Sequence, residues 1–376
     1  MALIQYLTSI RFDFGVLAEI EEDLGVLGLR RPLIVADAGV VAAGLVARLR
    51  AAAPVLAEAP LFDAVPSNPT EEAAEAATQL YKAEGCDGVV AIGGGSPIDL
   101  AKAVALLATH PGPLAPYAAI LGGMAKITTA VAPVIAIPTT AGTGSEVGRA
   151  ALVTLRDGRK LGLISPHLIP KRAICDPGLT LGLPPGLTAA TGMDALTHCI
   201  ETYLSPRDNP PAEAIALDGL KRAAGALPRA YANGTDRAAR REMMMAALEG
   251  GLTFQKGLGA VHSLSHALGG LKSPSLHHGT LNAVLLPAVL RFNAPAAPEK
   301  FAILRQALGL APMADLAAWV EGLNSDLGLP RTLGQMGVTA EVFATMAQAA
   351  FADHSTATNP RPLTVEDFQA LLEVSL

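Results

Sequence analysis

The sequence predicts an α/β domain with a parallel sheet, followed by an all-helical domain. In the first half, short apolar runs at residues 33–36, 88–92 and 134–137 alternate with Ala- and Leu-rich helical stretches. Continuous apolar strands separated by helices are typical of a parallel sheet covered on both faces. After the proline pair Pro184-Pro185, helical periodicity dominates and β-branched runs become rare. We therefore predict two domains, residues 1–183 and 184–376.

Helices are expected where apolar residues recur with helical spacing. In the first half, such stretches follow the first two strands, over residues 40–53 and 98–108. In the second half they cover residues 212–230, 236–255, 298–309, 313–327 and 340–352. The last helix is expected to start at Thr364, because Asp367 stands three residues later, in the spacing of a capping box.

The composition excludes several classes of protein. With 51% hydrophobic and 16% charged residues, the 376-residue chain can bury a large core and is not disordered. A net charge of −6 and only 4% aromatic residues do not suit a nucleic-acid-binding surface. No stretch supplies the ~20 apolar residues of a membrane helix. Three widely spaced cysteines and an N-terminus without a signal-peptide pattern predict a cytoplasmic protein.

A glycine-rich turn follows the second expected strand. Gly93 to Gly95 let the backbone approach a ligand, while Ser96 is expected to cap the next helix and Pro97 to occupy its first turn. The free N–H groups at such a helix start can bind a pyrophosphate. The alternative is a plain strand-to-helix turn, since the spacing is not the GxGxxG of the common dinucleotide motif.

A second polar loop follows the third expected strand. The segment PTTAGTGSEV carries Thr139, Thr140, Thr143 and Ser145 among two glycines. Hydroxyls and backbone N–H groups without a cation suit the ribose and diphosphate of a nicotinamide dinucleotide. Either loop alone could be a simple connection, but two of them after successive strands predict nucleotide binding.

Asp37 stands at the end of the first expected strand and has two interpretations. Its carboxylate could accept hydrogen bonds from both hydroxyls of an adenosine ribose and repel a 2′-phosphate, which would favour NAD over NADP. No Lys or Arg occurs between Asp37 and Arg48 to offset that repulsion. Alternatively, Asp37 caps the following helix.

Acidic and histidine residues of the second half have the spacing of metal ligands. Asp194 and His198 are four residues apart, as are His262 and His266, so each pair shares a helix face. A further pair, His277 and His278, precedes Gly279. A carboxylate with three imidazoles suits Fe²⁺ or Zn²⁺. Any single histidine could instead be a core or capping residue, but the grouping predicts a metal site.

Several long motifs, in order, resemble the iron-containing (group III) alcohol dehydrogenase family. They are GGGSPIDLAKA, PTTAGTGSE, DPGLTLGLPPGLTAATGMDALTHCIETYLSP and VHSLSHALGG…HHGTLNAVLLPAVLRFN. The resemblance covers nearly the whole chain. It implies a Rossmann-like N-terminal domain, a helical C-terminal domain, and a cleft between them for NAD(P) and a divalent metal. It also implies a small alcohol or aldehyde as substrate, and a homodimer or higher homo-oligomer.

The resemblance also implies individual site residues. The metal ligands would be Asp194, His198, His262 and His278. The catalytic residue would be His266, beside the nicotinamide and the substrate, where it relays a proton. The dinucleotide would contact a larger set: Asp37, Asn68, Gly94, Gly95, Ser96, Asp99, Thr139, Thr140, Thr143 and Lys160.

The sequence departs from the family pattern before the last ligand. The segment LKSPSLHHG is about two residues longer than usual and offers two histidines. His278 keeps the register of the following HGxxNAxxLP-like run and is the preferred ligand, with His277 as the alternative.

Other functions remain to be weighed. Maleylacetate reductases resemble this family but lack the aspartate that is present here as Asp194, which favours a metal-dependent enzyme. The specificity of a 4-hydroxybutyrate dehydrogenase is a further alternative that the sequence leaves open. A cyclase resembling dehydroquinate synthase would need several basic residues, yet only Lys256 and Lys272 occur between Phe254 and Asn282. A non-catalytic nucleotide-binding protein would not need a set of metal ligands.

Overall fold

The computed structural model describes residues 4, 8–271 and 273–376 of the chain. The residues form two compact units. Among the described residues, the helical unit comprises Ile4, Ala141–Thr143 and Leu183–Leu376, and the α/β unit comprises residues 8–140 and Gly144–Gly182. The loop after strand β5 therefore contributes residues to both units. Lys272 lies outside the described residues.

A six-stranded sheet forms the centre of the α/β unit. Its order is β1-β8-β5-β4-β2-β3, and every neighbouring pair is parallel. The strands are β1 (Ser9–Phe12), β2 (Pro32–Val35), β3 (Leu61–Phe62), β4 (Gly88–Gly93), β5 (Val134–Pro138) and β8 (Arg172–Cys175). The three strands expected from the sequence are β2, β4 and β5. They are neighbours in the sheet and fully buried.

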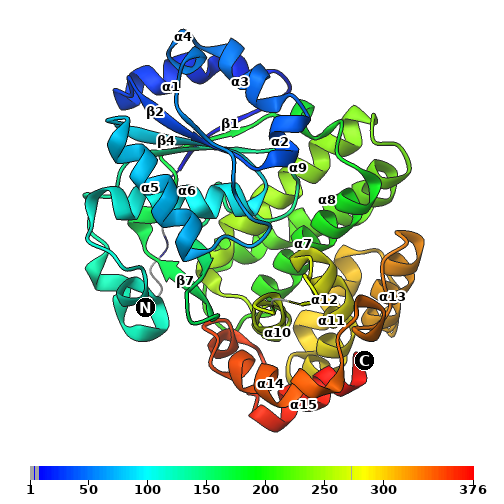
Figure 1. Cartoon of the computed structure of the whole chain (residues 1–376). Helices are drawn as coiled ribbons and strands as arrows, with labels where there is room; N and C mark the ends of the chain where they lie inside the picture. Colours follow the sequence, from blue (N-terminus) through cyan, green and yellow to red (C-terminus); the bar gives the residue numbers. More distant parts are fainter. Residues whose placement is uncertain (1–3, 5–7, 272) are drawn as a thin grey trace. The chain divides into compact units, whose positions relative to one another are not determined.

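Successive residues of these strands enter two different cores. Val89 and Ala91 of β4 belong to one hydrophobic cluster, whereas Val90 and Ile92 belong to another. Helices α5 (Glu71–Ala83) and α6 (Gly95–Thr109) supply the first cluster, and α1 (Ile20–Leu27) and α3 (Leu45–Ala52) supply the second. Figure 1 shows these helices on opposite sides of the sheet. Burial of both faces explains why the strands are continuously apolar and not alternating.

Local details differ from the expectations at three places. The helical stretch after β2 is broken into α2 (Ala38–Ala42) and α3, because Gly44 adopts a left-handed conformation with φ of 74°. Ser96 does not cap α6; the helix starts at Gly95 with Gly94 as its N-cap. A two-stranded antiparallel sheet of β6 (Ala150–Thr154) and β7 (Lys160–Ile164) was not expected.

The helical unit is built around one long buried helix, α7. Helix α7 (Pro185–Leu204) packs against α8 (Pro210–Ala232), α9 (Arg237–Leu252) and α11 (His278–Asn293). The other helices are α10 (Ala260–Gly269), α12 (Pro298–Ala307), α13 (Leu316–Asp326), α14 (Phe343–Phe351) and α15 (Val365–Val374). The predicted capping box of Thr364 and Asp367 starts α15. None of the helices within the described residues is long and apolar enough to span a bilayer.

Candidate functional site

Small residues let the helices of the helical unit approach α7 closely. A Cβ at Gly279, the second residue of α11, would lie 2.2 Å from the carbonyl oxygen of Ala190 on α7. A Cβ at Gly250 of α9 would lie 3.1 Å from the Cβ of His198. Glycine is therefore required where α11 starts, and it brings the preceding residue, His278, next to α7. This contact explains why a glycine directly follows His278, the predicted ligand.

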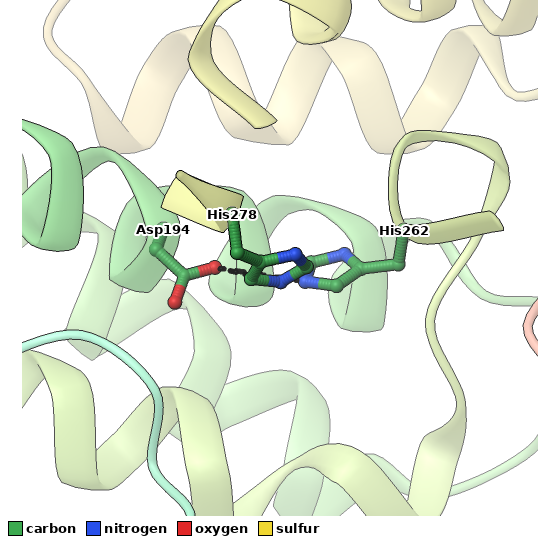
Figure 2. A group of neighbouring side chains, drawn as sticks. All are labelled: Asp194, His262 and His278. Carbon is green, nitrogen blue, oxygen red and sulfur yellow. Dashed lines mark ion pairs between the residues drawn. The ribbon is translucent and has the colours of Figure 1, made fainter. Parts of the chain in front are cut away.

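Three imidazoles surround one carboxylate oxygen. The Oδ1 atom of Asp194 lies 3.4 Å from Nε2 of His198 and 3.7 Å from Nε2 of both His262 and His278. Figure 2 shows the Asp194 carboxylate and the imidazoles of His262 and His278 turned toward one another. A tetrahedral ion with bonds of ~2.1 Å has ligand atoms about 3.4 Å apart. The separations from Asp194 are close to this value, and Asp194, His262 and His278 each offer a ligand atom that lies within 4.8 Å of the other two. His198 lies beside Asp194 but is not part of that group of three.

Hydrogen bonds at the far nitrogen orient two of these rings. Nδ1 of His198 lies 3.2 Å from the carbonyl oxygen of Gly142, and Nδ1 of His262 lies 2.6 Å from Oε2 of Glu201. Because an oxygen acceptor holds the proton on Nδ1, the lone pair of Nε2 is left for a metal. Glu201 also accepts from the backbone N–H groups of Gly259 and Val261, so it fixes the start of α10 together with the ring.

Asn282 provides a test of whether these residues fit a cation. Its Nδ2 atom donates to Oδ1 of Asp194 at 2.7 Å and lies 3.2 Å from Nε2 of both His262 and His278. Three potential metal-ligand atoms thus surround one amide nitrogen, whose two hydrogens cannot serve all of them, while Oδ1 of Asn282 is buried without a hydrogen-bond partner. A buried carboxylate surrounded by imidazole nitrogens favours a cation, so the donor set fits a metal ion.

The electrostatics of the group follow from burial and from close pairing. Burial lowers the pKa of His198 to about 4. Burial also opposes protonation of His262, but hydrogen bonds to Asp194 and Glu201 outweigh it and raise its pKa to about 9. Although burial favours the neutral acid, the three neighbouring histidines hold the pKa of Asp194 well below its usual range. A metal would replace the His262 proton, so metal binding releases a proton.

Two other predicted histidines lie outside this group of donors. His277 is exposed at the N-cap position of α11, with Nδ1 3.4 Å from Oγ1 of Thr280. The structure therefore brings His278, and not His277, to Asp194. His266 is buried, its ring is stacked on that of His278 at 5.5 Å, and its Nδ1 lies 3.0 Å from Oδ2 of Asp353.

The two predicted nucleotide loops meet at the carboxyl ends of β4 and β5. The N–H of Thr139 donates to the carbonyl oxygen of Gly93 at 2.9 Å. A Cβ at Gly94 would lie 3.3 Å from Oγ1 of Thr140, so the glycine leaves room between the loops. Residue Thr143 belongs to the part of this segment that packs in the helical unit.

The remaining predicted nucleotide contacts have partners within the protein. Asp37 caps α2, because its Oδ1 accepts from the N–H of Val40 at 2.9 Å. Asp99 accepts from Oγ of Ser145 at 2.5 Å and from the N–H of Leu152 at 3.0 Å. The other predicted residues of this set are also paired: Ser96 Oγ donates to the carbonyl of Ser67 at 2.5 Å, and Lys160 Nζ donates to Oδ1 of Asn68 at 2.8 Å.

Sequence reasoning missed Glu201, Asn282 and Asp353. A signal existed for the first two: Glu201 is three residues after His198, and Asn282 is four residues after His278, so each shares a helix face with a predicted ligand. Asp353 is 87 residues from His266, and no local spacing links them.

Comparison with known proteins identifies the family. Residues 8–177 match the model of iron-containing alcohol dehydrogenase, and residues 188–376 match that of the C-terminal part of the Fe-containing alcohol dehydrogenase family. The chain belongs to the iron-containing alcohol dehydrogenase family. The fold, the family and the oxidoreductase class predicted from the sequence are thereby confirmed.

Relatives of this family cover the whole length of the chain. The 4-hydroxybutyrate dehydrogenase of Cupriavidus necator is 55% identical, over 100% of both proteins. The NAD-dependent methanol dehydrogenase of Bacillus methanolicus is 37% identical over 96% of each. Among solved structures, a 1,3-propanediol oxidoreductase superposes with a TM-score of 0.93 at 35% identity, with both chains fully covered. The family implies iron and NAD(H) as the cofactors.

Proposed function

We propose that this protein is an NAD-dependent dehydrogenase that interconverts a short primary alcohol and its aldehyde, with 4-hydroxybutyrate as the substrate. The observation that carries this choice is the 55% identity to a 4-hydroxybutyrate dehydrogenase over the full length of both chains. Two 1,3-propanediol dehydrogenases, at 36% and 40% identity, and a methanol dehydrogenase, at 37%, are less similar.

We assign the metal to the donors that converge in the helical unit. Asp194, His198, His262 and His278 would hold a divalent ion, Fe²⁺ by family membership, although the same donors also suit Zn²⁺. When bound, the ion supplies Lewis-acid polarisation of the alcohol oxygen, and the nicotinamide supplies the hydride acceptor.

We assign the proton transfer to His266. Its Nδ1 proton is held by Asp353, which leaves the Nε2 lone pair to accept the proton that the alcohol loses. Burial lowers the pKa of His266 more than Asp353 raises it, so the ring is neutral and able to accept a proton near pH 7.

We assign the dinucleotide to the loops at the carboxyl ends of β2, β4 and β5. The chain runs from β2 outward to β3 and returns to β4 on the other side of β2. Ligands of open parallel sheets bind at such a reversal of strand order. Asp37 follows β2 and Gly94 follows β4, so they flank this point. The free oxygen of the Asp37 carboxylate would meet the adenosine ribose, which favours NAD over NADP.

The proposal includes two properties that the sequence predicts. The protein would be cytoplasmic, where its cysteines Cys86, Cys175 and Cys199 stay reduced, as they are in the structure. It would also be a homodimer or a higher homo-oligomer, which light scattering of the purified protein would measure.

A substrate panel tests the function. Iron-loaded protein is mixed with NAD⁺ and, separately, 4-hydroxybutyrate, 1,3-propanediol, methanol or ethanol, and NADH is followed by absorbance. We expect the highest kcat/KM for 4-hydroxybutyrate, and loss of turnover in Asp194→Asn. Equal or better turnover of 1,3-propanediol would contradict the substrate assignment. A silent panel in both reaction directions would favour a non-catalytic nucleotide-binding protein.

A further inference from the structure

A second group of metal-binding side chains lies beside the first. It consists of His266 on α10 and of Asp353 and His354 in the segment after α14, and one potential ligand atom of each lies within 4.8 Å of the others. The Asp353 carboxylate stands between the two rings: Oδ2 lies 3.0 Å from Nδ1 of His266, and Oδ1 lies 3.6 Å from Nδ1 of His354. None of the roles assigned above uses His354.

The geometry of this group fits an ion. Two ligand atoms at ~2.1 Å from a metal are about 3.0 Å apart at a right angle and about 3.4 Å apart at the tetrahedral angle. The ring centroids of His266 and His354 lie 5.7 Å apart, and the ring planes differ by 18°. The N–H of Ser355 donates to Oδ1 of Asp353 at 2.8 Å and fixes the carboxylate. The His354 side chain is 29% exposed, so an ion can enter from solvent on that side.

We propose that His266, Asp353 and His354 form a second binding site for a divalent first-row transition ion such as Zn²⁺, distinct from the site centred on Asp194. Two imidazoles and one carboxylate are borderline ligands that select such ions over Mg²⁺ or Ca²⁺. Three protein ligands leave the remaining coordination positions to water, so the second ion is held more weakly than one bound by four protein ligands.

Occupation of this site would inhibit the enzyme, an effect that rests on the proposed role of His266. An ion at Nδ1 takes the place of the proton now donated to Asp353. The ring stays neutral, so its one N–H proton moves from Nδ1 to Nε2 and no proton is gained or lost. The Nε2 lone pair that would accept the alcohol proton is thereby lost. Excess Zn²⁺ should therefore inhibit reversibly, and a chelator should restore activity.

Metal stoichiometry tests the site without any use of substrate. Protein already loaded with one ion per chain is dialysed against graded Zn²⁺, and the zinc and iron bound per chain are measured. We expect uptake of one additional ion by the wild type and by His277→Ala, which removes an exposed histidine outside the group. In His354→Ala, and equally in the more conservative His354→Asn, the affinity for the second ion should fall at least ~10-fold. Loss of even an outer-shell partner of a ligand weakens metal binding ~10-fold or more, and His354 is proposed as a ligand itself.

Activity measured across the same titration separates this proposal from the proposed function. Excess Zn²⁺ should inhibit the wild type and His277→Ala, while His354→Ala should keep its basal turnover and need at least ~10-fold more Zn²⁺ for the same inhibition. A single ion per chain at all concentrations, or unchanged second uptake in both His354 variants, would overturn the site. His354-dependent uptake by a protein that turns over no alcohol would support the site and overturn the proposed function.

Discussion

Glu201 should control metal affinity although it is not a ligand. Its side chain is 3% exposed, and its carboxylate accepts hydrogen bonds from Nδ1 of His262 and from the N–H groups of Gly259 and Val261. In Glu201→Gln, one side-chain atom becomes an N–H₂ group that cannot accept, so at least one of these buried donors loses its partner. An unsatisfied buried donor costs ~1–3 kcal/mol. Loss of an outer-shell partner of a ligating histidine weakens metal binding ~10–100-fold.

The assay measures both effects of Glu201→Gln separately. Competition with a graded series of chelators gives the metal affinity, and urea unfolding of the metal-free protein gives the stability. Glu249→Gln is a matched control, because Glu249 is a largely buried glutamate of the same unit that pairs with Arg222 and not with a ligand. We expect Glu249→Gln to keep the metal affinity of the wild type. Wild-type affinity in Glu201→Gln would refute the idea that this carboxylate orients His262.

Three further predictions concern the last ligand, the coenzyme and the pH dependence of stability. His278→Ala should lose the metal ion and turnover, while His277→Ala should retain both. Metal analysis of the two proteins measures this, and the reverse result would assign the ligand to His277. Asp37→Ser keeps a capping oxygen for α2 but removes the charge. The ratio of kcat/KM for NADP⁺ to that for NAD⁺ should therefore rise with little change in melting temperature, and an unchanged ratio would leave Asp37 as a cap alone. Burial, assisted by Asp218, raises the pKa of Glu249 from 4.5 to about 8. The folded state therefore holds a proton that the unfolded state has released, and the stability from this group is lost as pH rises from 4.5 to 8. Urea midpoints should fall less between pH 6 and 8.5 in Glu249→Gln than in the wild type, and parallel pH profiles would contradict the assignment.

The elements that carry strong local patterns could be predicted from the sequence. Strand β4 is apolar at every position because both of its faces are buried, and the start of α15 carries the capping pair Thr364 and Asp367. The break at Gly44 and the N-cap at Gly94 could not be predicted with the same security, since glycine is compatible with a helix interior, a cap or a turn. The β6–β7 pair was not predicted. Strand β6 alternates between buried and partly buried residues, unlike the continuously buried strands β2, β4 and β5.

For the site, the sequence predicted which side chains lie close together, but not which hydrogen bonds orient each imidazole ring. Spacing of four residues placed Asp194 beside His198, and His278 was preferred over His277 from the register of Gly279. The close approach of that glycine to Ala190 explains the preference, since a side chain there would push α11 away from α7. Glu201 and Asn282 were missed because their contacts with the ligands depend on how α10 and α11 pack against α7.

The partners of Nδ1 and Nε2 account for the different proposed roles of the three histidines. His198, His262 and His266 each face an oxygen acceptor at Nδ1, supplied by Gly142, Glu201 and Asp353 respectively. In the first two, Nε2 lies within 3.7 Å of the Asp194 carboxylate, where a cation is favoured. The structure shows no such ion pair between His266 and Asp194 within the described residues, so its Nε2 remains available for proton transfer. Because all three acceptors are distant in sequence from the histidines that they hold, helical spacing alone could group the rings but could not separate ligands from a base.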